Sequence, residues 1–331
     1  MADEEVATKA PESDATEAQN VSGIPGDTKP DQGAASMGEH CTSDRPTPGG
    51  ETPTGEITKF HDIEVYLTKP ADYPHSPCKL LLLLTGGTGI HSTNNQVQAD
   101  KYATEGFLVV MPDQFAGDPA PSATTTATQG QADEQPSLIE QVKLGVAGIA
   151  KSFTIDMWLA RHTPEKVLPL LNNVITSVKE EFADAVANGG GIYAVGYCFG
   201  AKYALMLGSD LHKDVAAGQR DPATEAEEGM AKQGPQIKCG AIAHATGVSK
   251  EDMANCEVPT CVVAVEDDPL FPDHVRNAGL EAMKTKGLDH QFKVYTDVPH
   301  GFAVMGSYEG QSIMTKQTEA YDQMLAWLKA H

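Results

Sequence analysis

The chain has 331 residues, enough for one large α/β domain or two small ones, and a formal net charge of −22. An acidic chain without a cluster of lysine and arginine is a poor match for nucleic acid or for an anionic membrane surface. No apolar run approaches the roughly eighteen residues of a membrane-spanning helix, and no secretory signal opens the chain. The six cysteines lack the spacing of a zinc site, so we expect free thiols and a cytosolic protein.

The first part of the chain has the composition of a disordered segment. Residues 1–38 contain no aromatic residue and are rich in Ala, Glu, Asp, Gly, Pro and Ser. Such a segment cannot bury enough apolar surface to offset the entropy lost on ordering. We therefore expect a disordered acidic tail over residues 1–38 and one folded domain over residues 39–331. Residues 39–56, still rich in proline and glycine, are expected to lie along that domain.

From Ile57 onward, strand-like runs alternate with helical patterns. Strands are predicted over 57–67, 79–85, 107–111, 192–195, 238–244, 260–266 and 291–296, and helices over 92–104, 138–150, 164–187, 272–286 and 312–330. This alternation predicts an α/β fold with a mostly parallel central sheet and helices on both faces. Two polar stretches, 116–137 and 210–236, interrupt the pattern and are expected to form long loops that shape the pocket.

A candidate nucleophile lies in the segment 196–200, which reads Gly-Tyr-Cys-Phe-Gly between a predicted strand and a helix-prone run. This strand, tight turn and helix is how α/β-hydrolases hold their nucleophile, here with Cys198 in place of the usual serine. The flanking glycines leave room for a strained backbone, and the start of the helix directs its dipole at the side chain. A cysteine between two glycines is more often simply buried, but the strand and helix around it favour the nucleophile.

A thiol nucleophile needs a base, and the base needs an orienting carboxylate. In α/β-hydrolases the order along the chain is nucleophile, acid and histidine, with each residue placed after a later strand. His300 follows the last predicted strand, and an acidic cluster at 266–268 follows the strand before it. Within that cluster we predict Asp268, because Pro272 suits the first position of the next helix, with Asp267 as the alternative.

Backbone N–H groups are also required where negative charge develops during acyl transfer. Phe199, directly after the cysteine, is predicted to offer one such group, and Gly87 in the loop after the strand 79–85 is predicted to offer the other. The glycine-rich stretch 86–89 could alternatively cradle a phosphate. It lacks the lysine of a P-loop and the spacing of a dinucleotide fingerprint.

With Cys198, Asp268 and His300 in this order, the chain resembles the dienelactone hydrolase family, and most closely its fungal carboxymethylenebutenolidase-like branch. The resemblance runs from about residue 40 to the C-terminus. Its supporting motifs are 86–95 followed by Gln-Ala-Asp-Lys at 98–101, Met-Pro-Asp at 111–113 and His-Gly-Phe at 300–302. It implies a single α/β-hydrolase domain without metal or organic cofactor. It also implies an acyl-enzyme on Cys198 that is hydrolysed by water activated by His300.

Two departures from the family pattern concern the substrate and the activation of the thiol. Gly86 stands where bacterial members carry a glutamate close to the cysteine. No arginine or lysine occurs from 300 to 310, where the family places a carboxylate-binding arginine; Val304 and Met305 occupy that region. We therefore expect a neutral, apolar ester or lactone as substrate, in a pocket that Phe302 and Met305 help to line.

The function predicted from the sequence is thus the cysteine-dependent hydrolysis of a small ester or lactone. The first alternative is an isomerase or cyclase that acts on a biosynthetic intermediate in the same pocket. The second is a scaffold that has the fold but no activity, with the acidic tail recruiting partners. The expected partner is a small molecule, and we expect a monomer or a homodimer.

Overall fold

The computed structural model describes residues 42–121, 154–210 and 234–331, which belong to a compact unit over residues 35–331. The described part contains an eight-stranded sheet in the order β1-β2-β4-β3-β5-β6-β7-β8. The strands are β1 (Glu56–Phe60), β2 (Ile63–Thr68), β3 (Lys79–Leu84), β4 (Phe107–Pro112), β5 (Ile192–Tyr197), β6 (Cys239–Ala243), β7 (Thr260–Val265) and β8 (His290–Tyr295). The six strands β4-β3-β5-β6-β7-β8 pair in parallel. Strand β2 pairs antiparallel with β4, and β1 pairs antiparallel with β2. The predicted α/β class with a mostly parallel sheet is confirmed.

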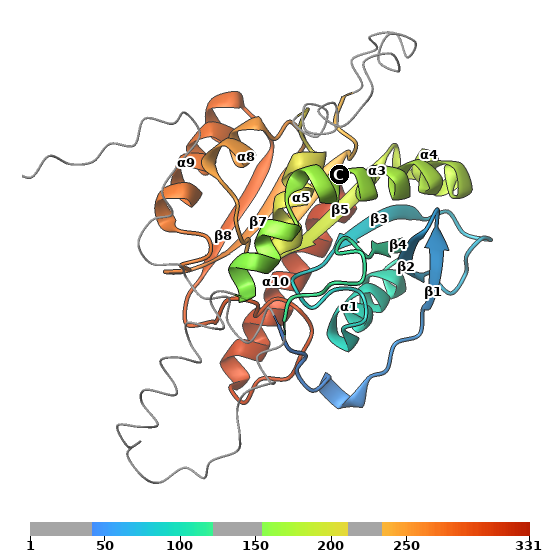
Figure 1. The fold of residues 1–331 in the computed structure, drawn as a ribbon, viewed down its shortest axis with the longest axis horizontal. Coiled ribbons are helices and arrows are strands. Elements are labelled where there is room, and N and C mark those ends of the chain that lie inside the picture. Colours follow the sequence, from blue (N-terminus) through green and yellow to red (C-terminus); the bar gives the residue numbers. More distant parts are fainter. Residues whose placement is uncertain (1–41, 122–153, 211–233) are drawn as a thin grey trace, which may run out of the picture. The chain divides into compact units, whose positions relative to one another are not determined.

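Helices cover both faces of this sheet (Figure 1). They are α1 (Thr93–Thr104), α3 (Pro164–Glu181), α4 (Ala183–Gly189), α5 (Phe199–Leu207), α8 (Lys250–Asn255), α9 (Asp273–Lys286) and α10 (Gln311–Ala330), with a short 3-10 turn at Pro48–Gly50. Side chains of α1 and α10 pack on one face, and those of α3, α5, α8 and α9 pack on the other. Successive leucines of β3 alternate between these two cores, because neighbouring side chains of a strand point to opposite faces.

Two predicted elements differ in the structure, and two helical segments were not predicted. The single strand expected at 57–67 is a hairpin of β1 and β2, in which His61 turns the chain with a positive φ of 52°. The helix expected at 164–187 is interrupted at Phe182, whose ring packs edge-on against Phe60. The short helix α8 and the helical residues 154–161 were not predicted. α8 is too short to show a helical repeat, but a capping box between Ser249 and Asp252 fixes its start.

Several predictions lie outside the described residues. These are the disordered tail over 1–38, the helix at 138–150 and most of the loops at 116–137 and 210–236. Among the helices that the structure describes, none combines the length and the apolar character that crossing a bilayer requires.

Parallel pairing brings the carboxyl ends of four strands to one edge of the sheet. Tyr197, the last residue of β5, pairs with Ala243, the last residue of β6. Strand β6 pairs in parallel with β7, and β7 pairs in parallel with β8. In an open α/β sheet this edge is where functional side chains gather. The segments that follow β5, β6, β7 and β8 are the ones that carry Cys198, Thr246, Asp268 and His300.

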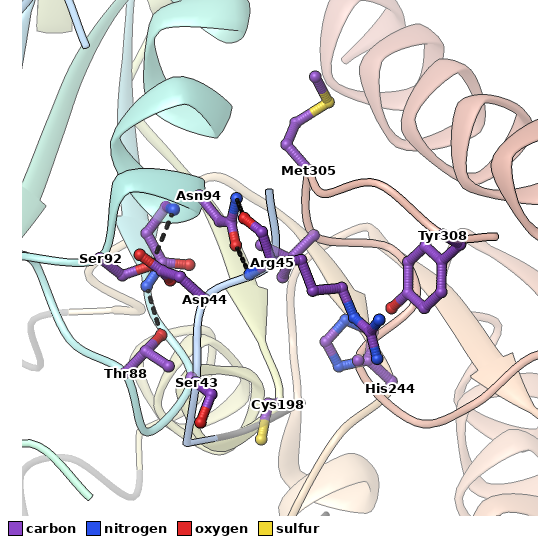
Figure 2. Close-up of a pocket in the computed structure, with 14 residues that line it drawn as sticks. Ser43, Asp44, Arg45, Thr88, Ser92, Asn94, Cys198, His244, Met305 and Tyr308 are labelled. Atoms are coloured by element: carbon purple, nitrogen blue, oxygen red, sulfur yellow. Dashed lines mark hydrogen bonds between the residues drawn. The ribbon is translucent and has the colours of Figure 1, made fainter. Parts of the chain in front are cut away.

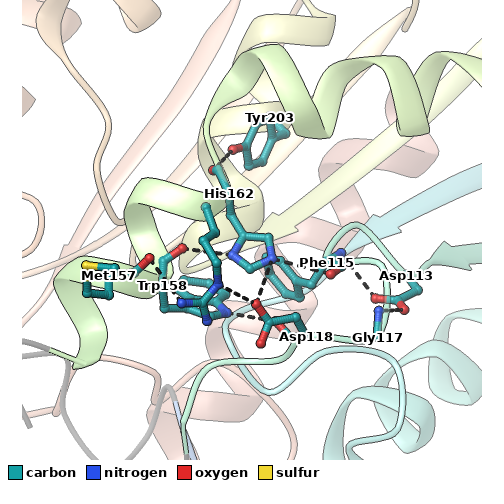
Figure 3. Close-up of polar contacts among 9 residues, drawn as sticks. Asp113, Phe115, Gly117, Asp118, Met157, Trp158, His162 and Tyr203 are labelled. Carbon is teal, nitrogen blue, oxygen red and sulfur yellow. Dashed lines mark hydrogen bonds and ion pairs between the residues drawn. The ribbon is translucent and has the colours of Figure 1, made fainter.

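An aromatic and polar cluster that includes Phe115, Trp158 and His162 (Figure 3) packs against Phe199 at the start of α5. The Phe199 ring lies 5.0 Å from that of Trp158 and 5.8 Å from that of Phe115, between ring centroids. The Trp158 indole donates to the carbonyl of Asp118, and both ring nitrogens of His162 contact backbone carbonyls. These contacts fasten the loop after β4 to the helical residues 154–161 and so position the residue that follows Cys198.

Candidate active site

Cys198 lies in the tight turn between β5 and α5 with φ 51° and ψ −113°, a conformation that a non-glycine residue adopts only when its surroundings impose it. Its backbone N–H donates to the carbonyl of Ala243 at 3.0 Å. Its carbonyl accepts from the backbone N–H of Thr246, also at 3.0 Å. The end of β6 therefore holds the strained residue on both sides, and the thiol faces the edge of the sheet.

The two glycines of the predicted motif are required because other backbone atoms approach them closely. A Cβ atom on Gly200 would lie 2.2 Å from the carbonyl oxygen of Leu84, and one on Gly196 would lie 2.6 Å from the carbonyl oxygen of Gly200. Real Cβ atoms do not come so close to backbone atoms. Any larger residue at either position would force the strand, the turn and the helix apart.

His300 and Asp268 form a buried pair close to Cys198. The Nδ1 atom of His300 lies 2.7 Å from Oδ2 of Asp268, whose side chain is fully buried. The other carboxylate oxygen of Asp268 accepts from the backbone N–H of Leu270 at 3.0 Å. Asp267, the alternative left open by the sequence, is exposed and turns the chain with φ 51°. Of these two acids, only Asp268 reaches the imidazole.

Thr246 lies between the thiol and the imidazole and was not predicted. Its hydroxyl oxygen is 3.2 Å from Sγ of Cys198 and 3.2 Å from Nε2 of His300. The side chain is buried, and the residue follows the end of β6 by three positions. A threonine after a strand has no distinctive sequence signal, so only its placement in space singles it out.

The charges around His300 favour its protonated form. Burial alone lowers the pKa of His300, but the Cys198 thiolate and the Asp268 carboxylate raise it to about 9 in total. Beside a thiolate and a carboxylate, the imidazole of His300 is therefore protonated at neutral pH. Burial raises the pKa of the thiols of Cys239 and Cys261 to about 12.

A small cavity of about 30 Å³ opens onto Cys198. It is lined by Gly86 and Thr88 after β3, by the start of α1, by His244 and by the segment after His300. Its remaining wall is an N-terminal arm, residues 42–47, that crosses the site (Figure 2). The space suffices for roughly one or two water molecules.

The N-terminal arm is fastened to the start of α1 and carries a cation into the cavity. Asp44 accepts from the Ser92 hydroxyl and from the backbone N–H of Thr93, where the helix dipole favours a carboxylate. Arg45 exchanges two hydrogen bonds with the Asn94 side chain through its backbone, at 2.6 and 2.9 Å. Its guanidinium carbon lies 4.1 Å from the centroid of the Tyr308 ring.

Arg45 adds a cationic residue to the wall of the cavity. The expectation of a neutral substrate depended on the absence of arginine and lysine from 300 to 310, and it stays a prediction. Of the two predicted pocket residues, Met305 lines the cavity and Phe302 does not. Phe302 is fully buried against Tyr295 and is not among the residues that line the cavity. Met305 lines it, but its side chain points away from Cys198, and its sulfur lies 3.9 Å from Nζ of Lys101 (Figure 2).

Both predicted oxyanion donors are next in the chain to residues that line the cavity. Phe199 is the first residue of α5, and Gly87 lies between Gly86 and Thr88, which both line the cavity. A Cβ atom on Gly86 would be 3.1 Å from Cβ of Cys198, so the loop after β3 is in direct contact with the turn. The role of Phe199 and Gly87 as donors remains a prediction.

Comparison with known proteins places this site in a family. The chain matches the model of the dienelactone hydrolase family over residues 63–219 and 227–331. It is 28% identical to the hydrolase pyvD of Aspergillus violaceofuscus, covering 85% of this chain and 92% of that protein. It is 25% identical to the hydrolase tropI of Talaromyces stipitatus, covering 84% and 91%.

A solved structure has the same fold. The putative dienelactone hydrolase from Klebsiella pneumoniae superposes with a TM-score of 0.56 at 14% identity, covering 85% of this chain and all of that one. The sheet order and the helices on both faces agree with this likeness, so the predicted α/β-hydrolase fold is confirmed. The chain therefore belongs to the dienelactone hydrolase family and is a hydrolase of that family.

Proposed function

We propose that the protein hydrolyses a small ester or lactone through an acyl-enzyme on Cys198, with His300 as acid and base and Asp268 orienting His300. The observation that carries this proposal is the unbroken line of contacts from the thiol to the imidazole to the buried carboxylate, beside one cavity. Membership of the dienelactone hydrolase family supports hydrolase activity in general, without specifying the nucleophile.

In the proposed reaction the Cys198 thiolate attacks the substrate carbonyl carbon, and the carbonyl electrons move to the oxygen. Backbone N–H groups of Phe199 and Gly87 stabilise that oxyanion. The oxyanion then collapses, the carbon–oxygen bond to the leaving alkoxide breaks, and the imidazolium of His300 donates its proton to the alkoxide. Neutral His300 next takes a proton from water, which attacks the thioester and releases the acid and the thiolate.

Arg45 favours a substrate that carries an anionic oxygen, such as a carboxylate or an enolate. A guanidinium binds such groups through paired, charge-assisted hydrogen bonds. Arg45 lines the same cavity as Cys198, so the anionic group would lie within one small molecule's length of the reacting carbonyl.

The test combines turnover with detection of the intermediate. Wild type should hydrolyse a p-nitrophenyl ester, and a rapid quench followed by intact-mass spectrometry should detect an acyl group on the protein. Cys198→Ala should abolish both signals, whereas Cys78→Ala, a matched loss of a buried thiol before β3, should retain them. Undiminished turnover in Cys198→Ala would refute the proposal. Product without an acyl adduct would indicate direct attack of water on the ester in place of an acyl-enzyme. No ester turnover with a reactive Cys198 thiol would favour the isomerase or cyclase alternative, and no turnover with an unreactive thiol would indicate the scaffold.

A further inference from the structure

The turn that follows β3 sets the direction of the Gly87 N–H. In a trans peptide the carbonyl and the N–H point in opposite directions, so the Gly87 N–H lies opposite the Gly86 carbonyl. That carbonyl accepts from the backbone N–H of Gly89 at 3.2 Å inside the turn. The Gly87 N–H is therefore directed out of the turn, and no backbone carbonyl of the described residues accepts from it. A Cβ atom on Gly86 would lie 3.1 Å from Cβ of Cys198, so this peptide is next to the turn that holds the thiol.

Two groups of the loop after β4 hold this peptide from both sides along the chain. Before it, the side-chain amide of Gln114 donates to the carbonyl of Thr85 at 3.1 Å. After it, the backbone N–H of Ala120 donates to the carbonyl of Gly87 at 2.8 Å. Of these two hydrogen bonds, only the one from Gln114 is made by a side chain, so it is the one that a substitution can remove.

Gln114 is fully buried, and its amide oxygen has no hydrogen-bond partner among the described residues. Because a carbonyl oxygen only accepts, the amide nitrogen must be the end that faces Thr85. Burying an amide oxygen without a partner is unfavourable, so packing alone would favour an apolar side chain at this position. The contact with the Thr85 carbonyl therefore points to a role of Gln114 in the loop after β3.

The loop that carries Gln114 is itself fixed by a buried carboxylate. Asp113 accepts from the backbone N–H groups of Phe115 and Gly117 (Figure 3). A side chain that extends from a fixed turn restrains its hydrogen-bond acceptor more closely than one that extends from a loose segment. The aspartate of the Met-Pro-Asp motif at 111–113 thus fixes the turn from which Gln114 reaches the loop after β3.

We propose that Gln114 is a positioning residue that directs the Gly87 N–H at the oxyanion formed in the reaction on Cys198. This role rests on the proposed function, in which Cys198 is the nucleophile and Gly87 is an oxyanion donor. Such a donor is effective only when its direction is fixed before the negative charge develops. Without the hydrogen bond from Gln114, the Thr85 carbonyl is released and the peptide that follows it can rotate. Gln114 is not among the residues that line the cavity, so it acts through Gly87.

Substitution by methionine removes the donor and keeps the length of the side chain. Gln114→Met is therefore the first variant, and Gln114→Leu is the second should the methionine variant fail to fold. The matched control is Gln96→Met, because the Gln96 side-chain amide also donates to a backbone carbonyl after β3, that of Ile90, at 2.9 Å. Ile90 lies beyond the turn at 86–89, so the control removes the same kind of hydrogen bond and leaves the Gly87 peptide held.

The experiment compares two reactions of the Cys198 thiol. Acylation by p-nitrophenyl butyrate, followed as p-nitrophenolate release with enzyme in excess, forms an oxyanion. Alkylation by iodoacetamide takes place at a saturated carbon and forms none, so its rate, with that of Cys198→Ala subtracted, reports the thiolate alone. In Gln114→Met we expect acylation to slow by about 10- to 100-fold and alkylation to stay within about threefold of wild type. Gln96→Met should retain both rates, and thermal unfolding verifies that each variant is folded.

Three outcomes would overturn the role of Gln114. Equal losses of acylation and alkylation would place its effect on the thiol or on the fold as a whole. Undiminished acylation in a folded Gln114 variant would show that the Gly87 N–H needs no such support, and an equal loss in Gln96→Met would show that any loosening of this segment suffices. Absence of an acyl group on Cys198 in wild type refutes the proposed function and this role with it, whereas normal acylation of wild type with an unchanged variant refutes the role of Gln114 alone.

Discussion

Replacing Asp268 by asparagine tests the electrostatics of the site most directly. The carboxylate is fully buried and lies 2.7 Å from Nδ1 of His300, and it is one of the groups that raise the imidazole pKa to about 9. Asparagine keeps the size of the side chain but removes its negative charge. A hydrogen bond between charged groups contributes about 1.5–3 kcal/mol, and about 1.4 kcal/mol corresponds to one pH unit. We expect Asp268→Asn to lower the pKa of His300 by about one to two pH units.

The sign of the effect on catalysis follows from the proton that His300 donates. In wild type the imidazolium is present below about pH 9, so kcat/KM for an ester with a poor leaving group should fall above that pH. In Asp268→Asn the alkaline limb moves to lower pH, and kcat/KM at pH 7 should decrease by about 10- to 100-fold. Cys198, Thr246 and His244 also face the imidazole and remain unchanged.

The assay is a pH profile of kcat/KM with an alkyl ester or lactone, because a p-nitrophenolate leaves without a proton and would conceal the alkaline limb. Asp267→Asn is the matched control, since Asp267 is the exposed neighbour and asparagine tolerates its positive φ of 51°. The reasoning is refuted if Asp268→Asn retains the wild-type alkaline limb, or if Asp267→Asn displaces it equally.

Two further predictions concern recognition and folding. Arg45→Gln should raise KM for the anionic ester p-nitrophenyl hemisuccinate by about tenfold or more and leave KM for the neutral ester p-nitrophenyl butyrate unchanged. The control is Arg161→Gln, which removes an exposed arginine. An equal effect of Arg45→Gln on both esters would contradict anion binding. Gly200→Ala should lower the free energy of unfolding by about 1–3 kcal/mol or more, because its Cβ would meet the carbonyl of Leu84 at 2.2 Å. Chemical denaturation measures this loss against Gly234→Ala, where nothing lies within 4 Å, and equal stability of the two variants would contradict it.

The parts of the site that the sequence predicted are those encoded by local pattern and by topology. The turn at Cys198 is a contiguous motif between a strand and a helix, so its place at the sheet edge could be predicted directly. Asp268 and His300 follow later strands of a parallel sheet, and parallel strands end at the same edge. The choice of Asp268 agrees with the contact to His300, although Pro272 precedes the first residue of α9 as its cap instead of beginning the helix.

The parts that were missed depend on contacts between distant segments. Arg45 enters the cavity because Asp44 and Asn94 fasten the N-terminal arm to α1, and neither contact has a periodic or motif signal. Thr246 is an ordinary residue of a loop, and its place beside the thiol and the imidazole follows only from two distances in space. Phe302 adjoins the histidine along the chain but is buried in the core, whereas Met305 lines the cavity as predicted. Adjacency in sequence located the segment but did not show which of its side chains face the cavity.

In the proposed function, the reacting groups and the group that would bind the substrate's anion come from different parts of the chain. Cys198, Asp268 and His300 follow strands whose register fixes their mutual distances, and these strands lie within the segments that match the family model. Arg45 lies before residue 63, where that match begins, on an arm held by a few hydrogen bonds. A change in the arm can therefore alter which acyl group is bound without displacing the reacting atoms. Substrate range can diverge within this fold while the hydrolytic centre stays the same.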